Sequence, residues 1–163
     1  MLNANLNETA TAFGIVRIIK RNSEGEIVED HLFKNQLTNY ARQQAANLWA
    51  GPAANNYVPV TLPTTIQVGT GAPTPPLTGV DPTDTGLWTA MSGSSKTFDY
   101  STVWLNYTTQ YAVTYQQTDA VGTWTELGLF QGANLWAHVQ LTNFVKASGD
   151  TVTVQWNVLH IGN

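Results

Sequence analysis

Apolar and polar side chains alternate most regularly between residues 124 and 161, with the two-residue period of a strand that buries one face. Two turn sequences interrupt the alternation, Gln131–Asn134 and Ser148–Asp150, and both are rich in residues that tolerate tight turns. The pattern therefore predicts three consecutive strands that form an antiparallel meander, over Glu126–Phe130, Leu135–Leu141 and Val152–Val158.

A β-hairpin is predicted near the start of the chain. Its strands are Gly14–Arg21 and Glu26–Phe33, and the turn between them, Asn22–Gly25, ends in a glycine. The first strand carries β-branched apolar residues on both of its faces. We therefore expect this strand to be buried on two sides, by the core and by another chain.

One helix is predicted, over residues 38–50. Thr38 or Asn39 supplies a side-chain oxygen that caps the free N–H groups of the first turn, and Gly51 followed by Pro52 ends the helix. Apolar residues recur at three- and four-residue spacing, which predicts a buried stripe of Leu37, Ala41, Ala45, Leu48 and Trp49. The residues expected to face away from the core are Arg42, Gln43, Gln44 and Asn47.

The middle of the chain is predicted to contain a short strand, a long loop and a pair of strands. Thr64–Gly69 is the short strand, and Gly71–Thr85 is a loop because its prolines exclude regular structure. Lys96–Leu105 and Tyr107–Gln117 are the pair. Many short strands at close spacing favour a mainly-β fold, an antiparallel β-sandwich with one short α-helix.

The length of 163 residues suits one domain with its own core. We assign residues 13–163 to a single β-sandwich domain and residues 1–12, which are small and polar, to an extended N-terminal arm. Charged residues make up only 11% of the chain, compared with about 25% in ordinary soluble domains. A neutral polar surface of this kind fits a subunit that is packed against others, and it also fits a secreted β protein.

Several partners are disfavoured by what the sequence lacks. The net charge is −4 and the basic residues form no stripe, so a nucleic-acid partner is not expected. Cysteine is absent, which excludes disulfides and thiol catalysis. No apolar run is long enough for a membrane span and the first residues do not resemble a signal peptide. We therefore expect synthesis in a cytoplasm and no membrane partner.

Few residues suggest reaction chemistry. His31, His138 and His160 lie on three different predicted strands and show no metal-binding spacing, so no metal, cofactor or catalytic role is assigned to them. Asp81 and Asp84 lie in the proline-rich loop, where they form an incomplete set of calcium ligands. Asx-turns, in which the carboxylates accept nearby backbone N–H groups, account for both, and ion binding is the alternative.

Glu126 is a carboxylate at the start of an apolar strand, so its burial would demand a partner or a shifted pKa. A structural ion pair is the favoured interpretation, with Arg17, Arg42 or Lys146 as the partner. A glycosidase carboxylate is the alternative, with Asp99 or Asp119 as the second acid.

Three of the six tryptophans bear on function. Trp156 shares a face with three valines and is predicted to lie in the core, whereas Trp136 stands on the polar face beside His138 and Trp88 lies near a loop end. Exposed tryptophan stacks on sugars and also anchors protein interfaces. The low charge of the chain favours an interface, and a glycan site is the alternative.

Five short motifs follow the first hairpin. They are KNQLTNYARQQAANLWAG at Lys34–Gly51, IQVGTG at Ile66–Gly71, DTGL at Asp84–Leu87, ELGLF at Glu126–Phe130 and FVKASGDTVTVQWNV at Phe144–Val158. Their order resembles that of small virion structural proteins of tailed bacteriophages, of the tail-collar, tail-fibre and head-accessory type. The resemblance covers nearly the whole chain after the first dozen residues.

The resemblance implies a non-enzymatic β-sandwich subunit of the virion, made in the host bacterial cytoplasm. The expected role is head decoration (cement) or a collar or tail accessory, through contacts with copies of itself and with other capsid, collar or tail proteins. The alternative is a carbohydrate-binding adhesion module that binds a host surface glycan.

From the residues themselves, the interface is expected to combine the arm, the proline-rich loop and two tryptophans. Its predicted members are Leu2, Leu6, Phe13, Pro73, Pro75, Pro76, Leu77, Trp88 and Trp136.

Overall fold

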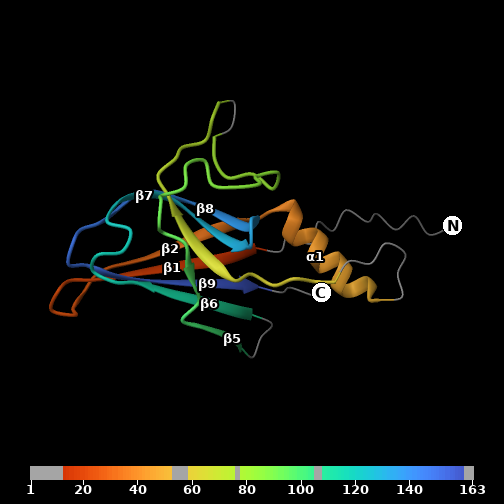
Figure 1. Cartoon of the computed structure of the whole chain (residues 1–163), viewed down its shortest axis with the longest axis horizontal. Helices are drawn as coiled ribbons and strands as arrows, with labels where there is room; N and C mark the ends of the chain where they lie inside the picture. Colours follow the sequence, from red (N-terminus) through yellow and green to blue (C-terminus); the bar gives the residue numbers. More distant parts are fainter. Residues whose placement is uncertain (1–12, 53–58, 76–77, 105–107, 160–163) are drawn as a thin grey trace.

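The structure is a computed structural model, and it describes residues 13–52, 59–75, 78–104 and 108–159 (Figure 1). The strands in this part of the chain are β1 (Phe13–Arg21), β2 (Ile27–Leu37), β3 (Thr65–Gly69), β4 (Lys96–Thr97), β5 (Tyr100–Trp104), β6 (Thr108–Tyr115), β7 (Gly122–Gln131), β8 (Asn134–Lys146) and β9 (Thr151–Leu159). The helix is α1 (Asn39–Ala50). The predicted class, a mainly-β antiparallel fold with one short helix, is confirmed.

All nine strands belong to one sheet, in the order β4-β3-β7-β8-β2-β1-β9-β6-β5. Strands β8 and β2 pair at only two positions, Ala137 with Leu37 and His138 with Gln36. The sheet folds over at this short junction into two facing layers, a four-stranded layer (β4-β3-β7-β8) and a five-stranded layer (β2-β1-β9-β6-β5). The sandwich is therefore built from one continuous sheet rather than from two separate ones.

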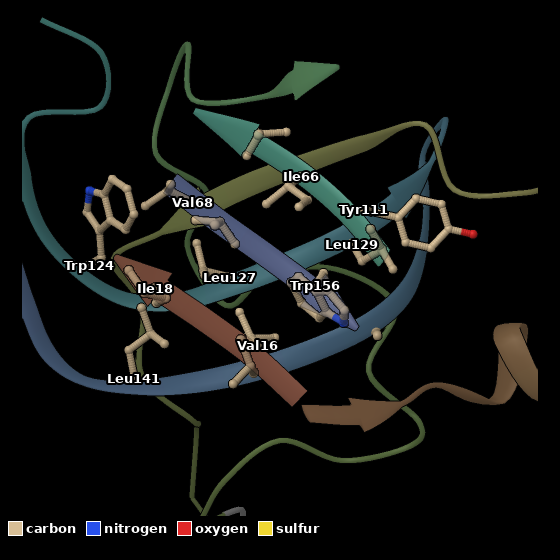
Figure 2. Close-up of a cluster of buried hydrophobic side chains, with 14 of the residues drawn as sticks. Val16, Ile18, Ile66, Val68, Tyr111, Trp124, Leu127, Leu129, Leu141 and Trp156 are labelled. Carbon is tan, nitrogen blue, oxygen red and sulfur yellow. The ribbon is translucent and has the colours of Figure 1, made fainter. Parts of the chain in front are cut away.

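The core lies between the two layers. Figure 2 shows side chains from β1, β6 and β9 pointing toward side chains from β3, β7 and β8. Its largest members are Trp124, Trp156 and Tyr115, and all three are fully buried. The Tyr115 hydroxyl in β6 donates to the carbonyls of Ile66 (3.1 Å) and Ser94 (3.0 Å), which ties the five-stranded layer to β3 across the core.

The predicted meander of the last three strands is wrong in its third member. Strands β7 and β8 pair as expected, but β9 pairs with β1 and β6 instead of β8. The turn at Ser148–Asp150 therefore carries the chain from one layer to the other. Side-chain alternation has the same period in either layer, so the sequence pattern could not distinguish the two arrangements.

Strand β7 is buried on both faces. One face contributes Leu127 and Leu129 to the core. The opposite face is covered by the loop between β3 and β4, residues 70–95, which we call the 70–95 loop. Over β8 the cover comes from both α1 and the loop: Tyr40 of α1 packs edge-on against Trp136, and Trp88 of the loop packs against His138. Trp136 and His138 are consequently buried, which corrects the prediction that they stand on an open polar face.

Helix α1 begins and ends where the sequence predicts. Thr38 is the N-cap, its hydroxyl accepts from the Ala41 N–H, and Gly51 ends the helix with a φ of 70°. The predicted apolar stripe is correct for Leu37 and Ala41 but wrong for Leu48, which is 63% exposed, and the side chain of Trp49 lies outside the described part of the structure. Gln44, predicted to face away from the core, is buried, and its amide oxygen accepts from the backbone N–H of Thr61.

The cross-layer bonds of Tyr115 are expected to matter for stability. Tyr115→Phe removes a buried donor from two carbonyls and should lower the free energy of unfolding by about 1–3 kcal/mol. Tyr100→Phe is the matched control, because Tyr100 is 44% exposed and its hydroxyl bonds the side chains of Gln110 and Gln155, so its loss should cost less than about 0.5 kcal/mol. Denaturant unfolding of the two variants measures the difference, and equal losses would contradict the assignment.

Candidate functional site

Three ionisable side chains meet beneath the 70–95 loop. The His138 ring in β8 lies between two carboxyl groups, with Nδ1 2.7 Å from Oδ2 of Asp84 and Nε2 2.8 Å from Oε2 of Glu126. Glu126 and His138 are fully buried, and the Asp84 carboxylate is nearly so. We call this set the Asp84–His138–Glu126 cluster. It is the most concentrated charge in the described interior.

The backbone of the loop closes around Glu126. Its Oε1 accepts N–H bonds from Gly71 (3.1 Å) and Thr89 (2.9 Å), and its Oε2 accepts one from Trp88 (2.9 Å). The loop is thus held to the sheet at both of its ends by one carboxylate. Without these bonds three backbone donors would be buried without a partner, which is costly.

Two glycines make room for this carboxylate. A Cβ atom on Gly69 would overlap the Glu126 side chain, and one on Gly71 would lie 2.5 Å from the Thr89 nitrogen and 2.8 Å from Oε1 of Glu126. The sequence VGTG therefore permits the close approach of the loop to β7. This glycine-rich sequence does not bind a phosphate through Gly71, because the N–H of Gly71 already donates to Glu126.

The hydrogen bonds of the cluster act on the pKa of Glu126. Both ring nitrogens of His138 lie within hydrogen-bond distance of a carboxyl group. Burial alone would raise the pKa of Glu126, but the hydrogen bonds from His138, Thr89 and Trp88 outweigh it, so the pKa lies below its ordinary value.

Asp81 forms the predicted Asx-turn, whereas Asp84 does not. Oδ1 of Asp81 accepts from the N–H (2.8 Å) and the hydroxyl (2.6 Å) of Thr83, and these bonds lower the pKa of Asp81. Oδ2 of Asp84 accepts from the Asp81 N–H (2.9 Å) and also contacts His138. Within the described residues no group of three or more acidic or histidine side chains is arranged to hold a metal ion.

The predicted ion-pair partner of Glu126 is wrong. Arg17 instead bonds Asp30 on the surface, and the Lys146 ammonium donates to the carbonyl of Gln117. Of the two acids proposed to act with Glu126 in a glycosidase, Asp99 and Asp119, Asp119 accepts a hydrogen bond from Lys96. The partner of Glu126 is His138 of β8. His138 lies directly across from Gly128 of β7, two residues along the strand from Glu126, so the pairing of the two strands brings the carboxylate and the ring together.

The cluster is arranged to fasten the 70–95 loop. Every ionisable atom that contacts another in the cluster is buried, and Glu126 is fully enclosed by loop backbone and by the ring of His138. A general acid or base must reach the proton that it transfers. The arrangement therefore favours a positioning role, in which the cluster fixes the loop on the four-stranded layer.

A shallow pocket of about 330 Å³ adjoins the cluster. It is lined by the start of α1, the 82–85 segment of the loop and the β7–β8 turn, with Tyr40, Asp84 and Asn134 among its polar side chains. Asp84 thus lines the pocket and contacts His138 in the interior. The N–H of Asn39 at the start of α1 donates to the carbonyl of Pro82 (2.6 Å).

The predicted interface residues are dispersed over the fold. Leu2, Leu6, Pro76 and Leu77 lie outside the described residues, and Phe13 begins β1. Pro75 is exposed and Pro73 is half-buried in the loop. Trp88 is half-buried with its ring centroid 4.8 Å from that of His138. Trp136 is buried under α1 and does not belong to an exposed surface.

Comparisons with protein-family models, with curated proteins and with solved structures gave no match to this chain. The described residues also contain no helix with the length and apolarity needed to cross a membrane. Function therefore has to be inferred from the geometry of the chain itself.

Sequence reasoning missed the cluster because its members are 42 and 12 residues apart along the chain, counted from Asp84 to Glu126 and from Glu126 to His138. One signal was available. Three of the motifs that carry the resemblance, IQVGTG, DTGL and ELGLF, contribute Gly71, Asp84 and Glu126, and these residues converge on one site. In this fold the three motifs share one role, because each supplies a residue that holds the 70–95 loop to the sheet.

Removing the central carboxylate is expected to destabilise the protein. Glu126→Gln turns one acceptor oxygen into a donor that faces either a backbone N–H or the His138 ring, so the free energy of unfolding should fall by about 3–5 kcal/mol. Asp30→Asn breaks an exposed, solvent-screened ion pair with Arg17 and should change the free energy of unfolding far less. Denaturant unfolding at neutral pH measures both, and similar losses would contradict the role of Glu126.

The same carboxylate predicts an acid-dependent loss of stability. The folded-state pKa of Glu126 lies below its ordinary value of 4.5, so its contribution is complete above pH 4.5 and is lost as the pH falls below this value. The unfolding free energy of the wild type should therefore decrease more steeply on acidification than that of Glu126→Gln. Parallel curves between about pH 6 and about pH 3, a range that spans the ordinary titration of a carboxyl group, would show that Glu126 is not the group responsible.

Proposed function

We propose that this chain is a structural subunit of a larger protein assembly, of the kind found in virions of tailed bacteriophages. Its role is head decoration (cement) or a collar or tail accessory, exerted through protein–protein contacts rather than through a reaction. The observation that carries the proposal is the uneven cover of the fold. The four-stranded layer is covered by α1 and the 70–95 loop, whereas the β1–β2 hairpin exposes apolar side chains.

The exposed side chains of the hairpin are large and close together. Leu32 is 69% exposed, Ile27 52%, Val28 49% and Ile15 36%. Arg17 of β1 lies across from Leu32 of β2, and Ile15 lies two residues before Arg17 on the same face. Apolar side chains that gather on one surface are typical of a protein-interaction site. The sequence predicts that one face of the first strand is covered by another chain, and this surface is the proposed place of that contact.

The fastening of the loop also supports a structural role. The Asp84–His138–Glu126 cluster commits the buried ionisable groups of this region to holding backbone in place. A subunit that must present the same shape to many neighbours gains from a loop with one fixed conformation, because less conformational entropy is lost on association.

Quantitative mass spectrometry of purified particles of the phage that encodes the chain tests the proposal. A structural subunit should be present at a fixed copy number per particle, in a multiple set by the symmetry of the head, collar or tail. Labelling by specific antibody and electron microscopy then distinguishes the three locations. Absence of the chain from washed particles would contradict the proposal.

A charge on the exposed hairpin is expected to weaken assembly without unfolding the chain. Leu32→Lys places an ammonium group in the surface that is proposed to be buried, and incorporation into particles should fall at least about tenfold, since a buried unpaired charge costs several kcal/mol. Val121→Lys is the matched control, because Val121 is 46% exposed in the loop before β7. Equal incorporation of both variants would exclude the hairpin from the contact.

The pocket beside Asp84 favours a second candidate function, the binding of a host surface glycan. Tyr40 with carboxylate, amide and hydroxyl side chains around it is the kind of lining that binds sugars. The sites proposed from sequence, Trp136 above all, are less suitable because Trp136 is buried. Glycan-array binding that is lost in Asn134→Ala, while the fold and particle incorporation are kept, would support this candidate.

A further inference from the structure

The pocket of about 330 Å³ beside the start of α1 has a one-sided charge. Asp84 is the only one of its eight lining residues that carries a formal charge at neutral pH, and no lysine, arginine or histidine lines it. The other lining side chains are amides, hydroxyls and apolar groups. A ligand in this pocket therefore meets a single charged group, and that group is an anion.

The Asp84 carboxylate is fixed in position by one of its oxygens and keeps the other open. Oδ2 accepts from the Asp81 N–H (2.9 Å) and lies 2.7 Å from Nδ1 of His138. Oδ1 makes no hydrogen bond within the described residues, and it is not one of their buried polar atoms without a partner, so solvent reaches it. A positioned acceptor oxygen is thus available at the wall of the pocket.

The groups behind Asp84 add to its negative charge. His138 lies between Asp84 and Glu126, and one imidazole ring can carry at most one positive charge against two carboxylates. Arg42 of α1 acts on the carboxylate of Asp81, which does not line the pocket. The charge that faces a ligand is therefore negative, and in a partly enclosed site it is screened less than in open water.

The start of α1 does not reverse this preference. The N-terminus of a helix attracts anions through its free N–H groups. Here the Asn39 N–H donates to the carbonyl of Pro82 (2.6 Å), and the Ala41 N–H donates to the Thr38 hydroxyl. Two N–H groups of the first turn are thus already used by the protein.

The neutral part of the lining fits a sugar better than a simple ammonium group. The side chains of Asn39 and Thr85 are exposed and make no hydrogen bond within the described residues. Amides and hydroxyls donate as well as accept, whereas an alkylammonium only donates. A ligand that satisfies both groups needs hydroxyls of its own in addition to a positive charge.

Tyr40 gives the pocket a rigid aromatic wall. Its hydroxyl donates to Oε1 of Gln131 (3.0 Å) and contacts the hydroxyl of Thr61 (3.1 Å). Its ring packs edge-on against Trp136, with the centroids 6.5 Å apart. A ring held in this way loses little conformational freedom when the apolar face of a sugar packs against it.

We propose that this pocket binds an amino sugar, a polyhydroxylated ring with a protonated primary amine. The ammonium group contacts Oδ1 of Asp84, the hydroxyls bond the amides and hydroxyls of the lining, and the ring packs against Tyr40. The volume lies at the low end of the range for small-ligand pockets, about 300–1,000 Å³, and suits one sugar residue. This inference rests on the second candidate function, the binding of a surface glycan, and specifies its chemical class.

An NMR titration of the full chain with three methyl glycosides tests the charge preference. Methyl glucosaminide, methyl N-acetylglucosaminide and methyl glucoside share one ring and differ at one substituent. At about pH 6, where the amine carries its proton, the glucosaminide should bind at least about fivefold more tightly than the other two. Its binding should shift the backbone signals of Tyr40, Thr85 and Asn134. Its advantage should shrink when the ionic strength rises from about 0.05 M to about 0.5 M.

A single charge in the ligand excludes the general attraction of a polycation to a chain of net charge −4. The test variant is Thr85→Lys, which places a cation in the lining and should remove the preference for the amine. Val121→Lys makes the same charge change at a 46% exposed position outside the lining and should keep the preference. Asp84 itself is left unchanged, because its contact with His138 fastens the 70–95 loop.

Three outcomes would overturn the proposal, and each has a different consequence. Equal affinities for the three glycosides, with shifts at the lining, would refute the charge preference and leave the glycan candidate standing. Binding of n-butylamine as tight as that of the glucosaminide would show a site for an ammonium group alone, such as a lysine of a partner protein. No shift at the lining with any glycoside would remove the glycan candidate as well, whereas the structural role is tested separately on particles.

Discussion

One carboxylate holds the covered side of this fold together. Glu126 accepts three backbone N–H bonds from the 70–95 loop and contacts the ring of His138, which in turn contacts Asp84 of the same loop. A buried charge is costly unless it is paired and fully hydrogen-bonded, and here the loop backbone and the ring of His138 together supply these partners. The loop in turn hides the outer faces of β7 and β8 from water. The carboxylate and its cover therefore depend on each other.

The short junction between β8 and β2 divides the sheet into two functional layers. Two residue pairs join them, so the sheet can fold over and enclose Trp124, Trp156 and Tyr115 between its halves. Before Gln36, β1 is the only strand that pairs with β2 in the described part of the chain. A fold of this kind has one finished side and one side that suits further contacts.

This asymmetry bears on the proposed role of the chain. The Asp84–His138–Glu126 cluster fixes the loop, whereas the exposed hairpin presents leucine, isoleucine and valine beside the Arg17–Asp30 ion pair. Large apolar side chains exposed on one surface are typical of an interaction site.

The sequence by itself determined most of the strands, the helix and its caps, and the Asx-turn of Asp81, because each depends on neighbours within a few residues. The predicted strand Lys96–Leu105 was wrong, because the structure divides it into β4 and β5 at opposite edges of the sheet. The alternation that identifies β9 is the same in either layer, so only the tertiary structure decided that β9 lies between β1 and β6. Trp136 and His138 looked exposed because the alternation in β8 shows only one buried face, and the residues that cover the other face are 50 or more positions away. The partner of Glu126 was likewise settled by strand pairing and by a distant loop. Local hydrogen bonds and periodicity can be read along a chain, whereas the contacts that bury a charge exist only after the chain has folded.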